Sequence, residues 1–100
     1  MTYNFPTHVS GDTFLGVDFQ LVINGVEKSL SGAKIIMRVG VKEFSSGRGE
    51  IAIINEAQGR FRFIEQVINL RPMTYRYKMV FIFPGGRRKS YLTGIWTITD

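Results

Sequence analysis

The alternation of apolar and polar residues constrains the fold of this chain more than any other feature. Between residues 74 and 83 the apolar side chains come at every second position, and cations such as Arg76 and Lys78 lie between them. A period of two is typical of a β-strand with one buried face. The same pattern predicts further strands at residues 16–23, 26–30, 33–41, 51–53, 60–64 and 91–99. Only residues 63–70 could form a helical turn, and the β-branched Val67 and Ile68 weigh against it.

Glycine, asparagine and proline separate these segments. Asn24-Gly25 predicts a two-residue type I′ turn, because both positions of that turn require a positive φ. Pro84-Gly85-Gly86 predicts the loop of the last hairpin, and residues 45–49 are expected to form a flexible loop. Short strands at this spacing are typical of an antiparallel sandwich or barrel. We therefore expect an all-β domain of about seven short strands over residues 1–100, with residues 1–10 as a loose N-terminal arm.

The composition supports a packed core without covalent reinforcement. Of the 100 residues, 44% are hydrophobic and none is cysteine, which excludes disulfides and thiolate metal sites. No apolar run approaches the roughly 20 residues that span a bilayer. The N-terminus also lacks the basic and apolar segments of a signal peptide. We expect a cytoplasmic protein with no membrane partner.

The positive charge lies in the second half of the chain. The formal net charge is +5, and residues 60–89 hold eight basic side chains and one acid, Glu65. This asymmetry suggests a nucleic acid or another polyanion as partner. However, alternation places Phe61 and Phe63 on one strand face and Arg60 and Arg62 on the other. The rings are therefore expected in the core and the charges in solvent, which argues against nucleic-acid binding.

One concentrated patch remains after this assignment. Arg87, Arg88 and Lys89 are consecutive and follow the last hairpin loop. They could bind an anionic partner, or keep the loop soluble and guard a strand edge against pairing. Trp96, the single tryptophan, could fill the core or anchor an interface, and the core is the preferred interpretation.

The residues that could perform catalysis are sparse. His8 is the only histidine, it lies near Pro6, and no set of metal ligands surrounds it in the sequence. The carboxylates are scattered, and a hydrolase would need two of them, such as Asp12 and Asp18, to converge. No nucleophile elbow, phosphate-binding loop or dinucleotide fingerprint occurs. We predict no enzyme activity, no metal and no cofactor.

Several motifs resemble a known family when they are taken in order. They are Gly11-Asp12-Thr13-Phe14, Gly16-Val17-Asp18-Phe19, Asn24-Gly25, Leu30-Ser31-Gly32-Ala33-Lys34-Ile35-Ile36-Met37, Ile51-Ala52-Ile53, Gly59-Arg60-Phe61, Tyr75-Arg76-Tyr77, Pro84-Gly85-Gly86 and the ending Tyr91-Leu92-Thr93-Gly94-Ile95-Trp96-Thr97-Ile98-Thr99-Asp100. Together they resemble small phage and prophage tail proteins, and they are similar to the immunoglobulin-like N-terminal domain of phage baseplate upper proteins. The resemblance implies an immunoglobulin-like β-sandwich that acts as a non-enzymatic structural module of the virion. Its implied partners are other tail or baseplate proteins and further copies of the chain, and the implied location is the virion assembled in the bacterial cytoplasm.

The sequence also departs from the family pattern. Lys78 stands where the family tends to have an acid, and Gly85-Gly86 stands where it has an Asp-Gly hairpin. Both changes make the surface more positive. The candidate partner contacts are Phe5, Arg48, Arg87, Arg88 and Lys89. The alternative function is a β-domain that binds a polyanion or nucleic acid through its basic second half.

Overall fold

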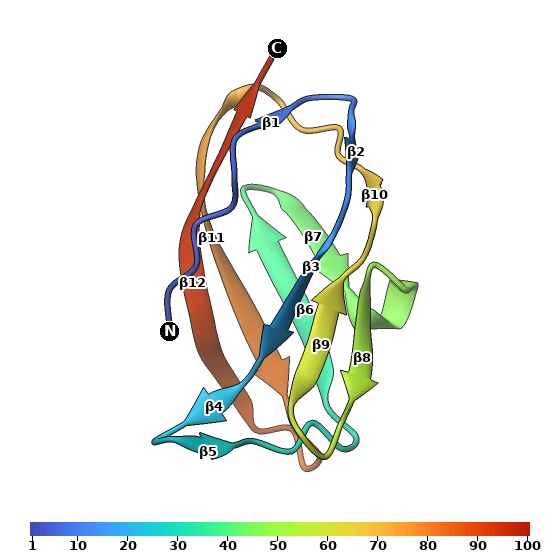
Figure 1. Ribbon diagram of the computed structural model, residues 1–100, viewed down its shortest axis with the longest axis vertical. Helices are drawn as coiled ribbons and strands as arrows, with labels where there is room; N and C mark the ends of the chain where they lie inside the picture. The colour runs from blue at the N-terminus through green and yellow to red at the C-terminus, as the bar shows by residue number, and fades with distance from the viewer.

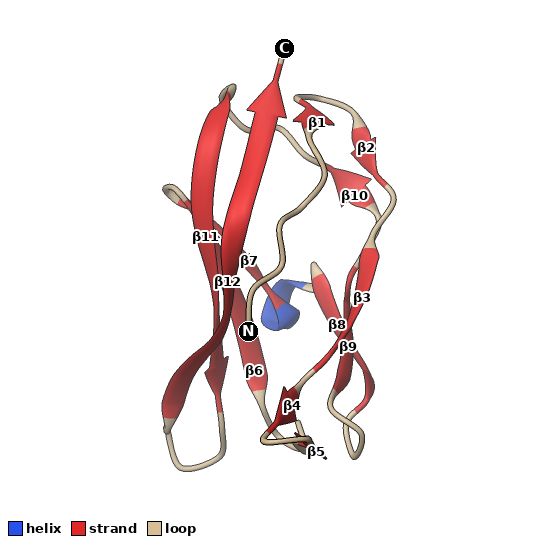
Figure 2. Cartoon of the chain, turned by 60° about the vertical axis from the view of Figure 1, so that its left-hand side comes forward, coloured by secondary structure: helices blue, strands red, loops and turns tan.

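Two facing β-sheets form the molecule in the computed structural model, which describes all residues 1–100. The larger sheet has the order β1-β12-β11-β6-β7. Its strands are β1 (His8–Val9), β12 (Arg88–Thr99), β11 (Met73–Ile82), β6 (Lys34–Val39) and β7 (Lys42–Ser45). The opposing sheet has the order β3-β9-β8, and Figure 2 shows the two layers side by side. Its strands are β3 (Val17–Gln20), β9 (Arg60–Phe63) and β8 (Ile51–Asn55).

Short strand pairs extend the smaller sheet at both ends. β2 (Thr13–Phe14) pairs with β10 (Gln66–Val67), so these two strands continue the β3–β9 ladder. At the other end, β4 (Val22–Ile23) and β5 (Val26–Glu27) form a hairpin. Asn24 and Gly25 have φ angles of 53° and 77°, which confirms the predicted type I′ turn. The all-β prediction is confirmed, and seven of the strands contain four or more residues.

The strand order matches that of an immunoglobulin sandwich except at the first strand, since β1 pairs with β12 rather than joining the β3-β9-β8 sheet. In the seven-stranded form of that fold, with the strands lettered A to G, strands B, E and D form one sheet and strand C packs beside F and G in the other. Here β3, β9 and β8 take the places of B, E and D, and β6, β11 and β12 take those of C, F and G. β7 is an additional strand at the edge of the larger sheet. A tyrosine corner is also present, because the Tyr75 hydroxyl donates to the Arg71 carbonyl at 2.6 Å as the chain enters β11. The predicted fold class is therefore confirmed.

The core is a single cluster of 21 buried residues between the two layers. Phe61 and Phe63 of β9 are fully buried, as the alternation predicts. The ring centroids of Trp96 in β12 and Phe63 are 5.9 Å apart. Tyr75, Tyr77, Met79 and Phe81 of β11 are buried as well. The interpretation of Trp96 as a core residue is confirmed.

The N-terminal segment is docked, so the prediction of a loose arm over residues 1–10 was wrong. The N–H groups of Tyr3 and Phe5 each donate, at 3.0 Å, to carbonyl oxygens of β12. β1 then pairs with β12 in parallel. Phe5 is only 5% exposed and stacks on Trp96 with ring centroids 4.5 Å apart. The apolar ring of Phe5 fills the core, and this burial holds the segment against the sheet.

Several other boundaries differ from the sequence prediction. The strand expected over residues 33–41 ends at Val39, because Gly40 turns the chain with φ 61°. The chain then returns as β7, which the sequence did not reveal because Phe44 is its only apolar residue. The expected loop at 45–49 contains a 3-10 turn, η1 (Ser46–Arg48). The strand expected over 26–30 shrinks to β5, and 63–70 contains β10 rather than a helical turn.

Candidate functional site

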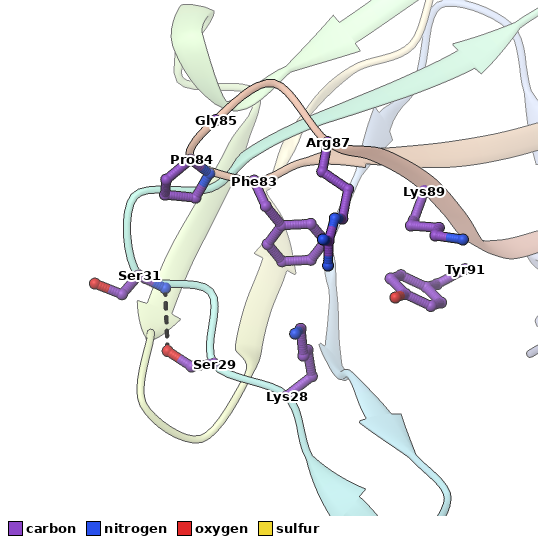
Figure 3. Close-up of a pocket in the computed structure, with 9 residues that line it drawn as sticks. All are labelled: Lys28, Ser29, Ser31, Phe83, Pro84, Gly85, Arg87, Lys89 and Tyr91. Carbon is purple, nitrogen blue, oxygen red and sulfur yellow. Dashed lines mark hydrogen bonds between the residues drawn. The ribbon is translucent and has the colours of Figure 1, made fainter.

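A basic recess of about 450 Å³ lies at the end of the sandwich where the β11–β12 loop meets residues 28–32. Three cations line it, Lys28, Arg87 and Lys89, together with the rings of Phe83 and Tyr91. Figure 3 shows these side chains converging from two segments that are far apart in the sequence. Arg87 and Lys89 were predicted as contacts, whereas Lys28 and the two rings were not.

A β-bulge in the last hairpin decides which cations reach the recess. Met79 pairs with Leu92, but the next residue, Val80, pairs with Ser90, so Tyr91 is the extra residue of β12. Lys89 is consequently opposite the buried Phe81 and shares its face of the sheet, since paired residues point to the same side. Arg88 pairs with Ile82 and lies on the outer face. The predicted run of three cations is therefore divided between two surfaces.

The cations in the recess have aromatic neighbours and no acidic partners. The Lys28 ammonium lies 5.1 Å from the centroid of the Phe83 ring, which is a cation–π distance. Tyr91 packs edge-on against Phe83 with centroids 6.3 Å apart. The ion pairs of the structure join Arg38 to Glu43, Arg48 to Glu50 and Arg62 to Asp18, all outside the recess. The recess thus has a concentrated positive charge beside two half-buried rings.

Backbone hydrogen bonds and burial hold the walls of the recess. The Lys28 N–H donates to the Leu21 carbonyl at 2.9 Å, and the Leu30 N–H donates to the Glu56 carbonyl at 2.7 Å. Leu30 itself is fully buried. Gly32 lies so close to Pro84 that a Cβ there would be 2.9 Å from the proline ring. The hydrogen bonds hold residues 28–30 in place, and the close approach of Gly32 to Pro84 brings the two walls of the recess together.

The other predicted contacts lie elsewhere. Phe5 is in the core and cannot contact a partner. Arg48 lies in η1, where its Nε is 3.0 Å from Glu50 and its terminal N–H donates to the Glu43 carbonyl of β7. Arg48 is thus committed to contacts within the chain. Arg88, on the outer face, is exposed.

The outer face of the larger sheet carries a second group of cations. Lys78 and Arg38 are directly opposite each other on β11 and β6, and Arg76 lies two residues before Lys78. Glu43 is the acid next to them, 3.1 Å from Arg38 on the far side from Lys78. We call Arg38, Arg76 and Lys78 the basic face; all three side chains are exposed.

The residues considered for metal or proton chemistry do not converge. The His8 ring nitrogen Nε2 lies 2.9 Å from the Asp12 carbonyl, which is a local contact between neighbouring residues. Histidine and carboxylate side chains nowhere gather in the groups of three or more that a metal ion needs. Helical structure is limited to one short turn, and no helix has the length and apolarity of a membrane span.

Comparison with known proteins gives no relative. Neither the models of known protein families nor the sequences of curated proteins match this chain.

Proposed function

We propose that this protein is a non-catalytic assembly module that binds other proteins by pairing strands at the edge of β8. The observation that carries the proposal is a difference between two neighbouring edges. β7 ends the larger sheet and β8 ends the smaller one, and η1 connects them. The edge of β7 is capped by side chains, whereas that of β8 has no such protection.

Side chains from the β7–β8 connection occupy the backbone groups along β7. Arg48 donates to the Glu43 carbonyl, and the Ser45 N–H donates to Oε1 of Glu50 at 3.0 Å. The Ser45 carbonyl accepts the Glu50 N–H at 3.1 Å. Charged side chains on an edge strand are a common means of preventing unwanted pairing. β7 is therefore closed to another strand along this stretch.

β8 has outward-facing backbone groups that no side chain caps. The Ile64 N–H donates to the Glu50 carbonyl at 3.2 Å, so these residues form a hydrogen-bonded pair of the β8–β9 ladder. Because hydrogen-bonded positions alternate in an antiparallel ladder, the N–H and C=O groups of Ile51 and Ile53 point away from β9. Ile53 is partly exposed, whereas Ile51 is 1% exposed and is covered in the free chain. The strand reads Ile-Ala-Ile-Ile-Asn, without a charge or a proline. An apolar edge of this kind is a template for another strand.

The strand that fits this edge best is β8 of a second copy. In an antiparallel arrangement, Ile51 of one copy pairs with Ile53 of the other once the residues that cover Ile51 have moved aside, and the outward N–H and C=O groups of both residues are then satisfied. Ala52 then faces Ala52 across the two-fold axis, where its small side chain permits close approach. No charged side chain of β8 opposes a like charge in this register. The interface is isologous, the common type in homodimers.

The resemblance in the motifs supports a virion setting for this module. We propose that it belongs to a phage or prophage tail or baseplate, where other tail proteins are its further partners. The immunoglobulin topology is consistent with this origin. The test is the position of the gene, which we expect among tail-assembly genes; a location among unrelated metabolic genes would contradict the proposed setting.

Pairing at β8 is tested by introducing a charge at Ala52, which lies at the two-fold axis. Light scattering should give twice the 11.4 kDa monomer mass for the wild-type protein. Ala52→Lys should be monomeric, because it places like charges opposite each other. An equimolar mixture with Ala52→Glu should restore the dimer. Val67→Lys, on a side chain that is 60% exposed on β10, is the control and should leave the mass unchanged. A monomeric wild type at about 0.1 mM, or a dimeric Ala52→Lys, would contradict the proposal.

The basic face favours a second candidate function, polyanion binding. Like charges directly opposite on neighbouring strands are unfavourable, and Lys78 lies opposite Arg38. A phosphate or sulfate backbone across this face would compensate both. Retention on heparin that weakens steeply with salt, and is lost in Arg38→Gln/Lys78→Gln, would support this function. Absence of retention at low salt would exclude it.

A further inference from the structure

We propose that the basic recess binds carboxylates of an acidic peptide segment of a partner protein. Binding there involves residues other than those of β8, and it adds a ligand class to the proposed function. It depends on the charge in the recess, on the rigidity of its walls, and on the way its rings are already engaged.

The positive charge in the recess favours binding of an anion. Lys28, Arg87 and Lys89 reach it from two segments, and none of them forms an ion pair. Gathering like charges raises the electrostatic energy of the free protein, and a negatively charged ligand relieves it. Arg87 offers a planar guanidinium that suits the two oxygens of a carboxylate. The ammonium groups of the two lysines provide further donors without a fixed direction.

The recess is organised before a ligand arrives. The carbonyls of Leu21 and Glu56 hold the backbone of Lys28 and Leu30, and Gly32 packs on Pro84. Binding therefore has to order only the ends of the basic side chains and of the ligand. A low ordering cost leaves more of the interaction energy as affinity.

The rings favour a peptide over a nucleic acid. Phe83 has the Lys28 ammonium over its ring, Tyr91 nearly perpendicular to it and Phe81 nearly parallel to it at 6.5 Å, so its ring is already engaged and is a poor platform for base stacking. The next cation along the chain, Arg88, is on the other side of the sheet, which interrupts any track along a phosphate backbone. The recess can instead receive the hydrocarbon part of a glutamate against the rings while its carboxylate meets the cations (Figure 3).

The experiment measures binding of a fluorescein-labelled peptide of eight alternating glutamate and leucine residues. Fluorescence anisotropy is recorded at about 50 mM salt for the full chain. Arg87→Gln/Lys89→Gln should weaken binding at least ~10-fold. Arg76→Gln/Lys78→Gln removes the same charge from the basic face and should change the affinity less than ~2-fold. Near-UV circular dichroism of both variants should match that of the wild type, which excludes misfolding.

Three results would overturn the proposal. The first is no binding of the peptide, and the second is an equal loss in both double variants, which would mean that only net charge matters. The third is tighter binding of a single-stranded oligonucleotide of equal charge that Arg87→Gln/Lys89→Gln abolishes, which would assign the recess to nucleic acid. Ala52→Lys should bind the peptide normally. Failure of pairing at β8 and failure of the recess are therefore distinguishable.

Discussion

Gly94 is the residue that permits the N-terminal segment to dock. A Cβ at this position would overlap the Tyr3 carbonyl oxygen, which also accepts the Tyr77 hydroxyl. Gly94→Ala should therefore displace the segment, expose Phe5 and reduce the free energy of unfolding by about 2–4 kcal/mol. Urea unfolding and hydrogen exchange at the Tyr3 and Phe5 amides measure this.

Gly47→Ala is the control for that substitution. A Cβ at Gly47 would find its nearest neighbour, the Ser45 hydroxyl, at an ordinary 3.9 Å. Its unfolding free energy should stay within ~0.5 kcal/mol of the wild type. Unchanged exchange at Tyr3 and Phe5 in Gly94→Ala would show that the close approach does not hold the segment.

The tyrosine corner stabilises the fold through one hydrogen bond. Tyr75→Phe removes the hydroxyl that donates to Arg71 and should lower the free energy of unfolding by about 1 kcal/mol. Tyr91→Phe is a matched change, because the Tyr91 ring is half-buried and its hydroxyl makes no hydrogen bond within the chain. Chemical denaturation should separate the two variants; equal losses would mean that the corner contributes nothing.

Because of Asp18, the free energy of unfolding should depend on pH in the acid range. The hydrogen bond from Arg62 lowers the pKa of this carboxyl below its usual 3.8, and the charges of Arg62 and Arg60 add to the effect. A lowered folded-state pKa contributes stability above the unfolded pKa, and this is lost as the pH falls through the folded value. The difference in melting temperature between the wild type and Asp18→Asn should be small, because the pair is exposed, and should decrease as the pH falls below 3.8, the usual pKa of the carboxyl. A difference that stays constant from pH 6 to pH 2 would contradict this.

At the scale of elements, the cap on β7 is the feature with the clearest consequence. Glu50→Ala removes the acceptor of the Ser45 N–H and the ion partner of Arg48. The free energy of unfolding should fall by about 1–3 kcal/mol, and the opened edge should promote concentration-dependent association. Glu43→Ala, which loses only an exposed ion pair with Arg38, should cost about 1 kcal/mol or less. Denaturation and light scattering together test both effects.

Strands with regular alternation of apolar and polar residues were predictable from the sequence. Strands and register shifts that depend on contacts with other segments were not. β9 and β11 follow directly from their patterns of rings and cations. β7 is as long as β9 but has a single apolar residue, Phe44, so it shows no alternation, and it forms because β6 offers it a partner. The bulge at Tyr91 leaves no sequence signal, yet it moves Lys89 to the recess and leaves Arg88 outside. The candidate site was therefore only half predictable, since its composition depends on that register shift and on Lys28 from another loop.

For the whole molecule, the single core predicts a single unfolding transition. The 21 buried residues form one cluster that includes Phe5 of the N-terminal segment and Trp96 of the last strand. Small domains with one core unfold in a two-state manner. The denaturation curves from Trp96 fluorescence and far-ultraviolet circular dichroism should coincide. Separate midpoints would mean that the two sheets, or the N-terminal segment, unfold independently.

The sequence by itself determined the all-β class, the hairpin turns and the aromatic core, because period-two alternation and positive-φ turn residues act locally. It also located the surplus positive charge in the second half of the chain. Only the tertiary structure decided that the first residues are docked, that side chains cap β7, and that three separate cations share one recess. These features depend on contacts between segments distant in the chain, and a periodic pattern carries no information about which segments meet.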